Sequence, residues 1–218
     1  MTCVFRNRAI VCVAALLWLA AWAAAGDWPQ FRGPAGLATA DDKDLPTKWD
    51  ATTNIAWKTP LPGRGASSPI VVGDRIFLTA YTGFAVDKKN PGTPSQLRIH
   101  LLCLKRSDGS ILWDKSLTTG AELPQPIFQI QLHGFASATP AADADTVYTL
   151  FDGGVVAAWG FDGTRKWTKD LKFRIHAWGT GGSPLLAGDV VIVVESMGDG
   201  LLVHRLPART FPEQTWGS

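Results

Sequence analysis

One sequence pattern occurs three times in this chain, and the repetition restricts the possible folds more than any other feature. Each copy has a Ser-Pro or Thr-Pro step, two or three apolar or small residues, a turn containing Asp, and an apolar, strand-like run. The copies superimpose without gaps at residues 67–80, 138–151 and 182–195. A chain built from such copies is expected to fold as one supersecondary unit used repeatedly.

A second element follows the first two copies. It is an Asp-Gly turn and a short strand that ends in Trp, at residues 107–113 and 161–167, and residues 54–61 place Trp57 in the same position before the first copy. Asp-Gly is typical of tight hairpins because Gly adopts positive φ without a steric penalty.

Strand signals dominate after residue 26, and helical periodicity is almost absent. Short β-branched or apolar runs lie between Gly, Pro, Asp and Ser clusters, as expected for strands. The clearest runs are residues 75–82, 97–104, 146–151, 155–161, 190–196 and 201–206.

A period of about 45–55 residues with four strands per unit is typical of a β-propeller. Such a sheet cannot bury both faces alone, so neighbouring sheets must stack. We therefore expect an all-β, partial β-propeller of about three four-stranded blades over residues 54–218. The tryptophans expected to dock between blades, spaced 56 and 54 residues apart, are Trp57, Trp113 and Trp167. The apolar residues expected in the same core are Phe77, Phe151 and Ile192.

The first 25 residues have the pattern of a secretory signal peptide. Arg6 and Arg8 precede an apolar run that ends in small residues, with no acidic residue before the cleavage position. A retained membrane anchor is the alternative, although the run is short for a span. We expect cleavage near residue 25, export to the periplasm or the extracellular space, and an N-terminal arm over residues 26–53.

The remaining chain is balanced in charge. Removal of Arg6 and Arg8 leaves 19 basic and 19 acidic side chains, which argues against nucleic acid or an anionic membrane as a partner. Cys103 is then the one remaining cysteine, so no internal disulfide is expected. No later apolar run reaches the length of a membrane span.

The repeat resembles that of a known family. The motif Asp-Gly-x-x-x-Trp, followed by Ser/Thr-Pro-x-x-x-x-Asp-x-Val/Ile-Tyr/Phe, resembles the pyrroloquinoline-quinone-like repeat of quinoprotein alcohol dehydrogenases and of the outer-membrane assembly lipoprotein propeller. Three further segments are similar to secreted proteins of the planctomycete type: residues 27–38, 133–140 and 174–184. The resemblance covers about residues 27–200 and implies the propeller fold.

The chain departs from the family in two ways. Complete members usually carry seven or eight blades, against about three here, and residues 204–218 lack the turn expected before Trp216. We interpret the chain as a truncated member, or as one frameshifted near residue 200.

The resemblance raises the question of a cofactor. A quinone-dependent dehydrogenase needs Ca²⁺ held by oxygen ligands beside the quinone, and the family often places a pair of adjacent cysteines over it. This chain has no such pair, and beyond residue 7 its asparagines are only Asn54 and Asn90. We expect no cofactor, with pyrroloquinoline quinone and calcium as the alternative.

Two functions remain open. The first is a non-catalytic binding or scaffold module in the bacterial cell envelope, which would present a protein, peptide or glycan partner with the inserted loops at residues 83–96 and 118–136. The second loop is partly apolar, and covering a blade edge is an equal alternative; its residues are Pro124, Pro126, Ile127 and Phe128. In the second, the chain is a fragment of a quinoprotein dehydrogenase. Enzymatic activity therefore stays open, and the sequence favours a non-catalytic protein.

Few residues stand out as site candidates. The histidines lack metal-type spacing, and no Gly-x-Ser-x-Gly elbow supports a hydrolase. The candidate binding residues are His133, His176 and Trp178. His176 and Trp178 precede a Gly-rich turn, where they would line a central channel; a packed, hydrogen-bonded His is the alternative.

Overall fold

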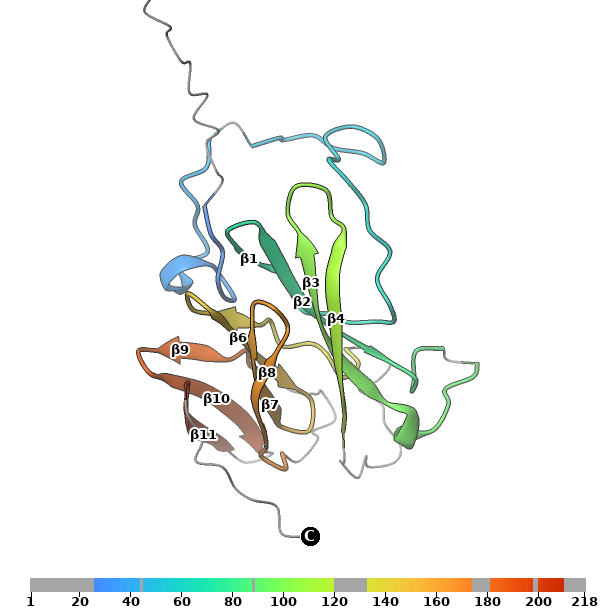
Figure 1. The fold of residues 1–218 in the computed structure, drawn as a ribbon, viewed down its shortest axis with the longest axis vertical. Coiled ribbons are helices and arrows are strands. Elements are labelled where there is room, and N and C mark those ends of the chain that lie inside the picture. The colour runs from blue at the N-terminus through green and yellow to red at the C-terminus, as the bar shows by residue number, and fades with distance from the viewer. Residues whose placement is uncertain are drawn as a thin grey trace, which may run out of the picture.

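The computed structural model describes residues 26–43, 45–87, 89–119, 133–173, 181–197 and 200–209, which form three antiparallel sheets (Figure 1). The first sheet contains β1 (Ile70–Val72), β2 (Arg75–Thr82), β3 (Arg98–Lys105) and β4 (Ile111–Thr118). The second contains β5 (Ala141–Ala142), β6 (Thr146–Phe151), β7 (Val155–Gly160) and β8 (Arg165–Asp170). The third contains β9 (Leu185–Ala187), β10 (Val190–Met197) and β11 (Gly200–Pro207). Two short 3-10 turns, η1 (Pro34–Gly36) and η2 (Pro94–Gln96), complete the described elements.

The three copies of the sequence pattern occupy equivalent places in the three sheets. Each enters a short first strand, turns, and continues as the second strand, and neighbouring strands pair in chain order. The expectation of an all-β, partial β-propeller is confirmed. The third sheet differs from it in having three strands rather than four within the described residues.

The sheets pack face to face, and the second sheet lies between the other two (Figure 1). Every residue of β6 and β7 is buried, because one face packs on the first sheet and the other on the third. Strands buried on both faces read as continuous apolar runs, which explains the sequence of β7, Val-Val-Ala-Ala-Trp-Gly. The outermost strands β4 and β8 are largely exposed.

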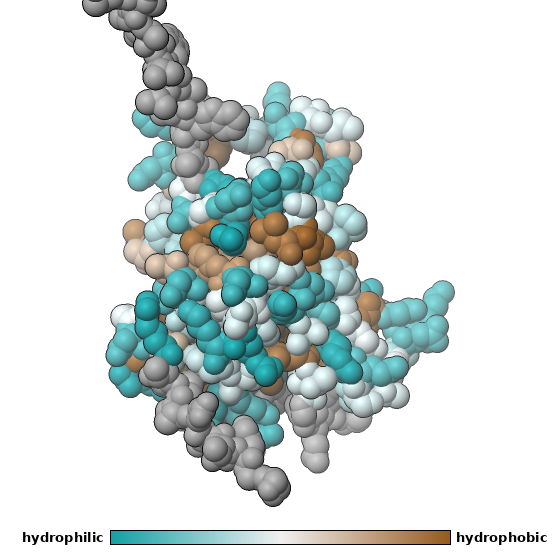
Figure 2. All heavy atoms as spheres, in the orientation of Figure 1, coloured by the Kyte–Doolittle hydropathy of each residue, from teal (hydrophilic) through white to brown (hydrophobic). Residues whose placement is uncertain are grey.

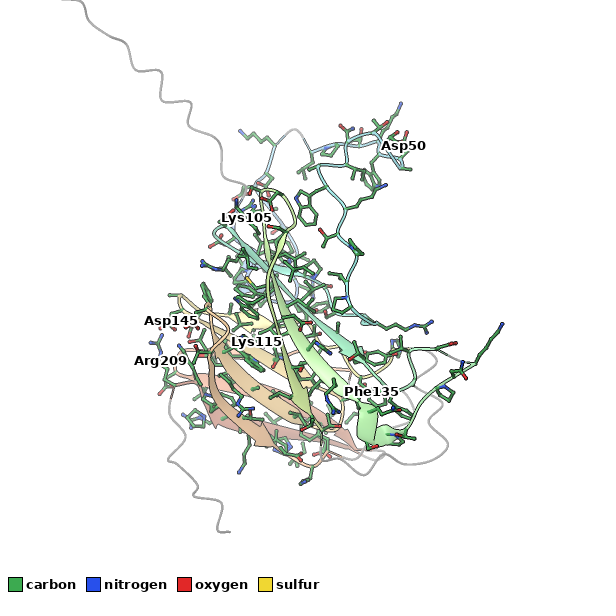
Figure 3. The ribbon with its side chains drawn as sticks, turned by 45° about the vertical axis from the view of Figure 1, so that its right-hand side comes forward. Asp50, Lys105, Lys115, Phe135, Asp145 and Arg209 are labelled. Carbon is green, nitrogen blue, oxygen red and sulfur yellow. The ribbon has the colours of Figure 1, made fainter. Side chains whose placement is uncertain are left out.

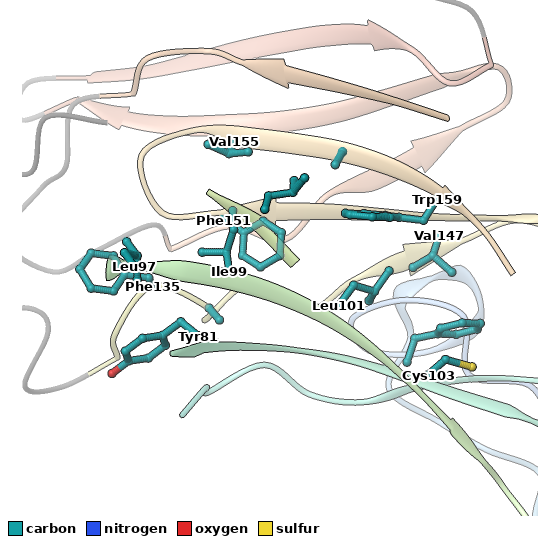
Figure 4. Packing of buried hydrophobic residues seen from close by; sticks show 14 of the residues in the cluster. Tyr81, Leu97, Ile99, Leu101, Cys103, Phe135, Val147, Phe151, Val155 and Trp159 are labelled. Carbon is teal, nitrogen blue, oxygen red and sulfur yellow. The ribbon is translucent and has the colours of Figure 1, made fainter. Parts of the chain in front are cut away.

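The interface between the first and second sheets forms the larger core (Figure 4). Phe77 and Phe151 are buried there, as expected, together with Tyr81, Leu101 and Trp159. On the surface, apolar residues gather across the middle of one face, with hydrophilic residues above and below them (Figure 2).

Ile192 does not join this core, contrary to expectation. Val191 and Val193 of β10 pack against the second sheet, and Ile192 is only half-buried. Successive side chains of a strand point to opposite faces, so Ile192 lies on the face of β10 that is turned away from the second sheet.

The N-terminal arm joins the inner edges of two sheets. The backbone of Trp28 pairs with Val71 of β1 through two hydrogen bonds of 2.8 and 3.0 Å. The carbonyl oxygen of Pro29 accepts a 2.8 Å bond from the N–H of Ala142 in β5. Gly33 has φ of +70°, and a Cβ there would lie 2.6 Å from the Trp28 ring, so the Arg32–Pro34 segment forms a turn under that indole.

No helix in the described part of the chain is long or apolar enough to cross a membrane. The expected signal segment, residues 1–25, lies outside the described residues.

Candidate binding site

Three tryptophans make the same hydrogen bond in three places. The indole N–H of Trp57 donates to the carbonyl oxygen of Arg106, that of Trp113 to Phe161, and that of Trp167 to Ala208, each at 3.0 Å. The acceptors are the residues that directly follow β3, β7 and β11. Trp113 and Trp167 therefore reach from one sheet to the next, and Trp57 stands in the corresponding position on the first sheet.

Two of these indoles cover glycines of Asp-Gly turns. Gly109 has φ of +71°, and a Cβ there would overlap the ring of Trp57. Gly163 has φ of +83°, and a Cβ there would lie 3.1 Å from Cδ2 of Trp113. The turns thus need glycine both for their backbone conformation and for close approach of the indole.

The Ser-Pro and Thr-Pro steps also connect the sheets. The N–H of Ser68 donates to Oγ1 of Thr139 at 3.2 Å, and the N–H of Thr139 donates to Oγ of Ser183 at 3.0 Å. These are equivalent residues of the three repeats, so the hydroxyls of Thr139 and Ser183 each accept a bond from the sheet before.

A pocket of about 480 Å³ opens beside the first sheet. Its walls are residues 61 and 63–67, residues 78–81 of β2, and residues 133–134 at the entry to the second sheet. Its ionisable side chains are Arg64, His133 and Tyr81, and no Asp or Glu lines it within the described residues. Leu61, Leu78 and small residues supply its apolar surface.

The two rims of this pocket are held against Tyr81. The N–H of Arg64 donates to the Tyr81 carbonyl at 3.0 Å, and the Tyr81 N–H donates to the Arg64 carbonyl at 2.7 Å. Gly63 and Gly134 have φ of +75° and +69°, and a Cβ at either would overlap Tyr81, on its carbonyl oxygen and on its ring respectively. The Tyr81 ring also packs edge-on against Phe135, at 5.3 Å between centroids.

Arg64 acts electrostatically on Tyr81. Burial raises the pKa of the Tyr81 hydroxyl, and the positive charge of Arg64 partly offsets that rise. The phenol is therefore neutral at physiological pH and can donate a hydrogen bond.

The structure brings together three polar residues that sequence reasoning missed. Oγ1 of Thr82 lies 2.8 Å from Nε2 of His100, and Nδ1 of His100 lies 2.8 Å from Oδ1 of Asp114. They come from β2, β3 and β4, and only the strand register makes them neighbours. This order, hydroxyl to imidazole to carboxylate, is that of a nucleophile, base and orienting acid.

The predicted site residues fall in different places. His133 is exposed at the rim of the pocket, whereas His176, Trp178 and the apolar loop residues 124–128 lie outside the described residues. A separate hydrogen bond of 3.2 Å joins Nε2 of His204 and Oε2 of Glu195, on the face of the third sheet that packs on the second. Figure 3 shows Phe135, which packs on Tyr81, at the opposite end of the first sheet from Lys105.

The side chains that the structure describes do not group as a calcium site beside a quinone would require. Within the described ranges, no three His, Cys, Asp or Glu side chains are grouped closely enough to hold a metal ion. Among the described residues, the pocket is lined by basic side chains and by no carboxylate. Ca²⁺ needs several oxygen ligands, usually with carboxylates among them.

Stacked sheets joined by equivalent indole and hydroxyl bonds define a β-propeller built from pyrroloquinoline-quinone-like repeats. A family model described as outer membrane protein assembly factor BamB matches residues 98–209, about half of the chain, and the chain belongs to that family. A search of curated proteins gave no significant match.

Two solved structures are similar to part of the chain. A europium-containing methanol dehydrogenase is 18% identical over 67% of this chain and 23% of its own, with a TM-score of 0.47. The quinohemoprotein alcohol dehydrogenase ADHIIG from Pseudomonas putida HK5 is 18% identical over 72% of this chain and 21% of its own, with a TM-score of 0.45. This chain thus spans less than a quarter of either protein.

Proposed function

We propose that this chain is a non-catalytic, exported propeller module that binds another protein in the bacterial cell envelope. The observation that carries the proposal is the pocket between Arg64 and His133, which combines a permanent positive charge, a hydroxyl and an apolar wall on a rigid rim. Such a mixture of apolar surface and a few placed polar groups is typical of binding sites. The assembly-factor name of the matching family also favours a protein partner.

A photo-crosslinking residue placed at Leu61 tests this proposal in cells. Leu61 lines the pocket and is exposed, so a bound partner would lie within reach. We expect one discrete crosslinked product that disappears with the additional substitution Arg64→Gln. Thr168, exposed on β8 of the second sheet, is the matched control position. Equal crosslinking from positions 61 and 168 would contradict a site at the pocket.

The quinoprotein alternative is tested by adding the cofactor. Pyrroloquinoline quinone and Ca²⁺ are titrated into the purified protein, and the quinone absorbance is followed. Because no three His, Cys, Asp or Glu side chains group together among the described residues, we expect no saturable change. A stoichiometric bound chromophore would replace the binding proposal by the dehydrogenase one.

The hydrogen-bonded chain of Thr82, His100 and Asp114 favours one second candidate, ester hydrolysis. The Thr82 oxygen would form a bond to the ester carbonyl carbon, and its proton would pass to His100 and then to the departing alcohol; water would release the acid. Hydrolysis of 4-nitrophenyl acetate decides between the candidates. Activity that disappears in both Thr82→Val and His100→Ala supports hydrolysis, and activity unchanged in these variants assigns the three residues a structural role.

A further inference from the structure

We infer that the pocket at Arg64 and His133 recognises a carboxylate flanked by apolar groups, from an acidic side chain or a chain terminus of the partner protein. The inference rests on the proposed function and specifies the chemistry that the site selects.

The first step of the argument is charge. Arg64 and His133 both line the pocket, and no Asp or Glu lines it within the described part of the chain. The ion pairs found among those residues do not include Arg64. A guanidinium in this situation is suited to a ligand carboxylate, since its fork of N–H groups matches two carboxylate oxygens.

The second step is position. The backbone around Arg64 is bonded to Tyr81 in both directions, and the flanking Gly63 and Gly65 approach β2 so closely that a Cβ on either would overlap it. The main chain of residues 63–65 is therefore fixed before a ligand arrives, which lowers the entropic cost of binding. Next to His133, Gly134 approaches the Tyr81 ring so closely that a Cβ there would overlap it, which positions the main chain at that side of the pocket.

The third step is the remaining surface. Leu61, Leu78, Ala66 and Ala80 also line the pocket, so the groups beside the carboxylate must be apolar to remain favourably buried. A volume of about 480 Å³ accommodates a few residues of a peptide rather than a folded surface. A carboxylate with Leu-sized neighbours fits both requirements.

Short peptides provide the probes. The first is acetylated and amidated, with one Glu between leucines; the second has Gln in place of Glu; the third is the Gln peptide with a free C-terminus. Each is titrated into the purified protein, and amide chemical shifts report binding. We expect at least one of the two carboxylate-bearing peptides to bind at least tenfold more tightly than the amidated Gln peptide, and its binding to weaken as NaCl is raised.

The third peptide distinguishes the two sources of the carboxylate. Preference for the Glu peptide would show that the partner's carboxylate comes from an internal acidic side chain. Preference for the peptide with the free C-terminus would show that it comes from the end of the partner chain. Equal binding of all three peptides, or binding of none, would overturn the inference. If position 61 still crosslinks to a discrete partner in cells, the proposed function stands while the carboxylate inference fails.

Variants identify the residues responsible. Arg64→Gln is expected to weaken binding of the preferred peptide about tenfold, Arg64→Lys less, and His133→Gln about threefold. Arg165→Gln is the matched control, because Arg165 is an exposed arginine on β8 away from the pocket. Unchanged amide spectra outside the pocket establish that each variant is folded, and wild-type affinity in Arg64→Gln would contradict the assignment.

Discussion

The indole N–H of Trp113, in the last strand of the first sheet, donates a 3.0 Å hydrogen bond to the carbonyl oxygen of Phe161, which follows the third strand of the second sheet. The Trp113 ring also packs 5.9 Å from that of Phe77, between centroids. One side chain thus connects two sheets and contributes to the core between them. The equivalent bonds of Trp57 and Trp167 show that the contact belongs to the repeat.

Replacing Trp113 with Ala is expected to lower the free energy of unfolding by about 3 kcal/mol, since it removes a large packed ring and leaves a cavity. Urea unfolding followed by circular dichroism measures the change. Leu112→Ala, at the neighbouring position where the side chain is 47% exposed, should change stability by less than about 0.5 kcal/mol. A loss below about 1 kcal/mol in Trp113→Ala would show that the indole does not join the sheets in solution.

Thr139→Val tests the hydroxyl connection between repeats. Valine keeps the shape of threonine but cannot accept the bond from the Ser68 N–H, so we expect a loss of about 1 kcal/mol in the free energy of unfolding. Thr139→Ser keeps the acceptor and should retain more of the stability. Equal urea midpoints for the two variants would indicate that water replaces the bond without loss.

The sequence pattern predicted most of the fold because its signals are local. The strands, the Asp-Gly turns and the repeat all depend on residues close together along the chain, and the fold class follows from their period. The expectation for Ile192 was wrong because a local pattern does not show whether another sheet covers a given face. Ile192 is equivalent to Phe77 and Tyr148 in the aligned copies, and those two side chains pack against the following sheet, whereas within the described residues no sheet follows the third one.

The candidate site was less predictable, because register and loop closure create it. Thr82, His100 and Asp114 are separated by 18 and 14 residues and become neighbours only across three paired strands. Arg64 lies in a segment without a strong pattern, and its pocket depends on Gly134, which enters from the next repeat. The sequence did show glycines beside Arg64 and His133, and glycine often marks a position where two segments of the chain approach closely.

Gly134→Ala is expected to disrupt the pocket more than a glycine substitution in open space. Both Gly134 and Gly73 have positive φ, so Ala strains the backbone at each by about 1 kcal/mol. Only at Gly134 does the new methyl overlap the Tyr81 ring, whereas at Gly73 it meets nothing within 4 Å. We expect Gly134→Ala to lose about 2 kcal/mol more than Gly73→Ala in urea unfolding. Equal losses would mean that Tyr81 is free to move.

The Cys103 thiol should be unreactive in the native protein. Burial raises its pKa to about 11, so the thiolate that reacts with alkylating reagents is scarce at pH 8. Iodoacetamide at pH 8 should label the denatured chain completely and the native chain hardly at all, as measured by mass spectrometry. The unfolded thiol ionises near pH 9 and the folded one near 11, so this group's contribution to stability is lost as pH rises through that interval. Rapid native labelling would place Cys103 outside the core.

Val203→Lys should reduce self-association of the chain. Within the described residues no strand pairs with the outer edge of β11, and the side chains of Leu201 and Val203 are 73% and 61% exposed. Flat apolar edge strands favour intermolecular pairing, and a lysine opposes it by charge. We expect sedimentation velocity to show concentration-dependent association of the wild-type chain and a larger monomer fraction in Val203→Lys. Thr168→Lys, at an exposed position of the outermost strand β8, is the matched control. If both variants associate like the wild type, contacts other than the β11 edge hold the copies together, because a charge placed in a paired apolar strand cannot be neutral.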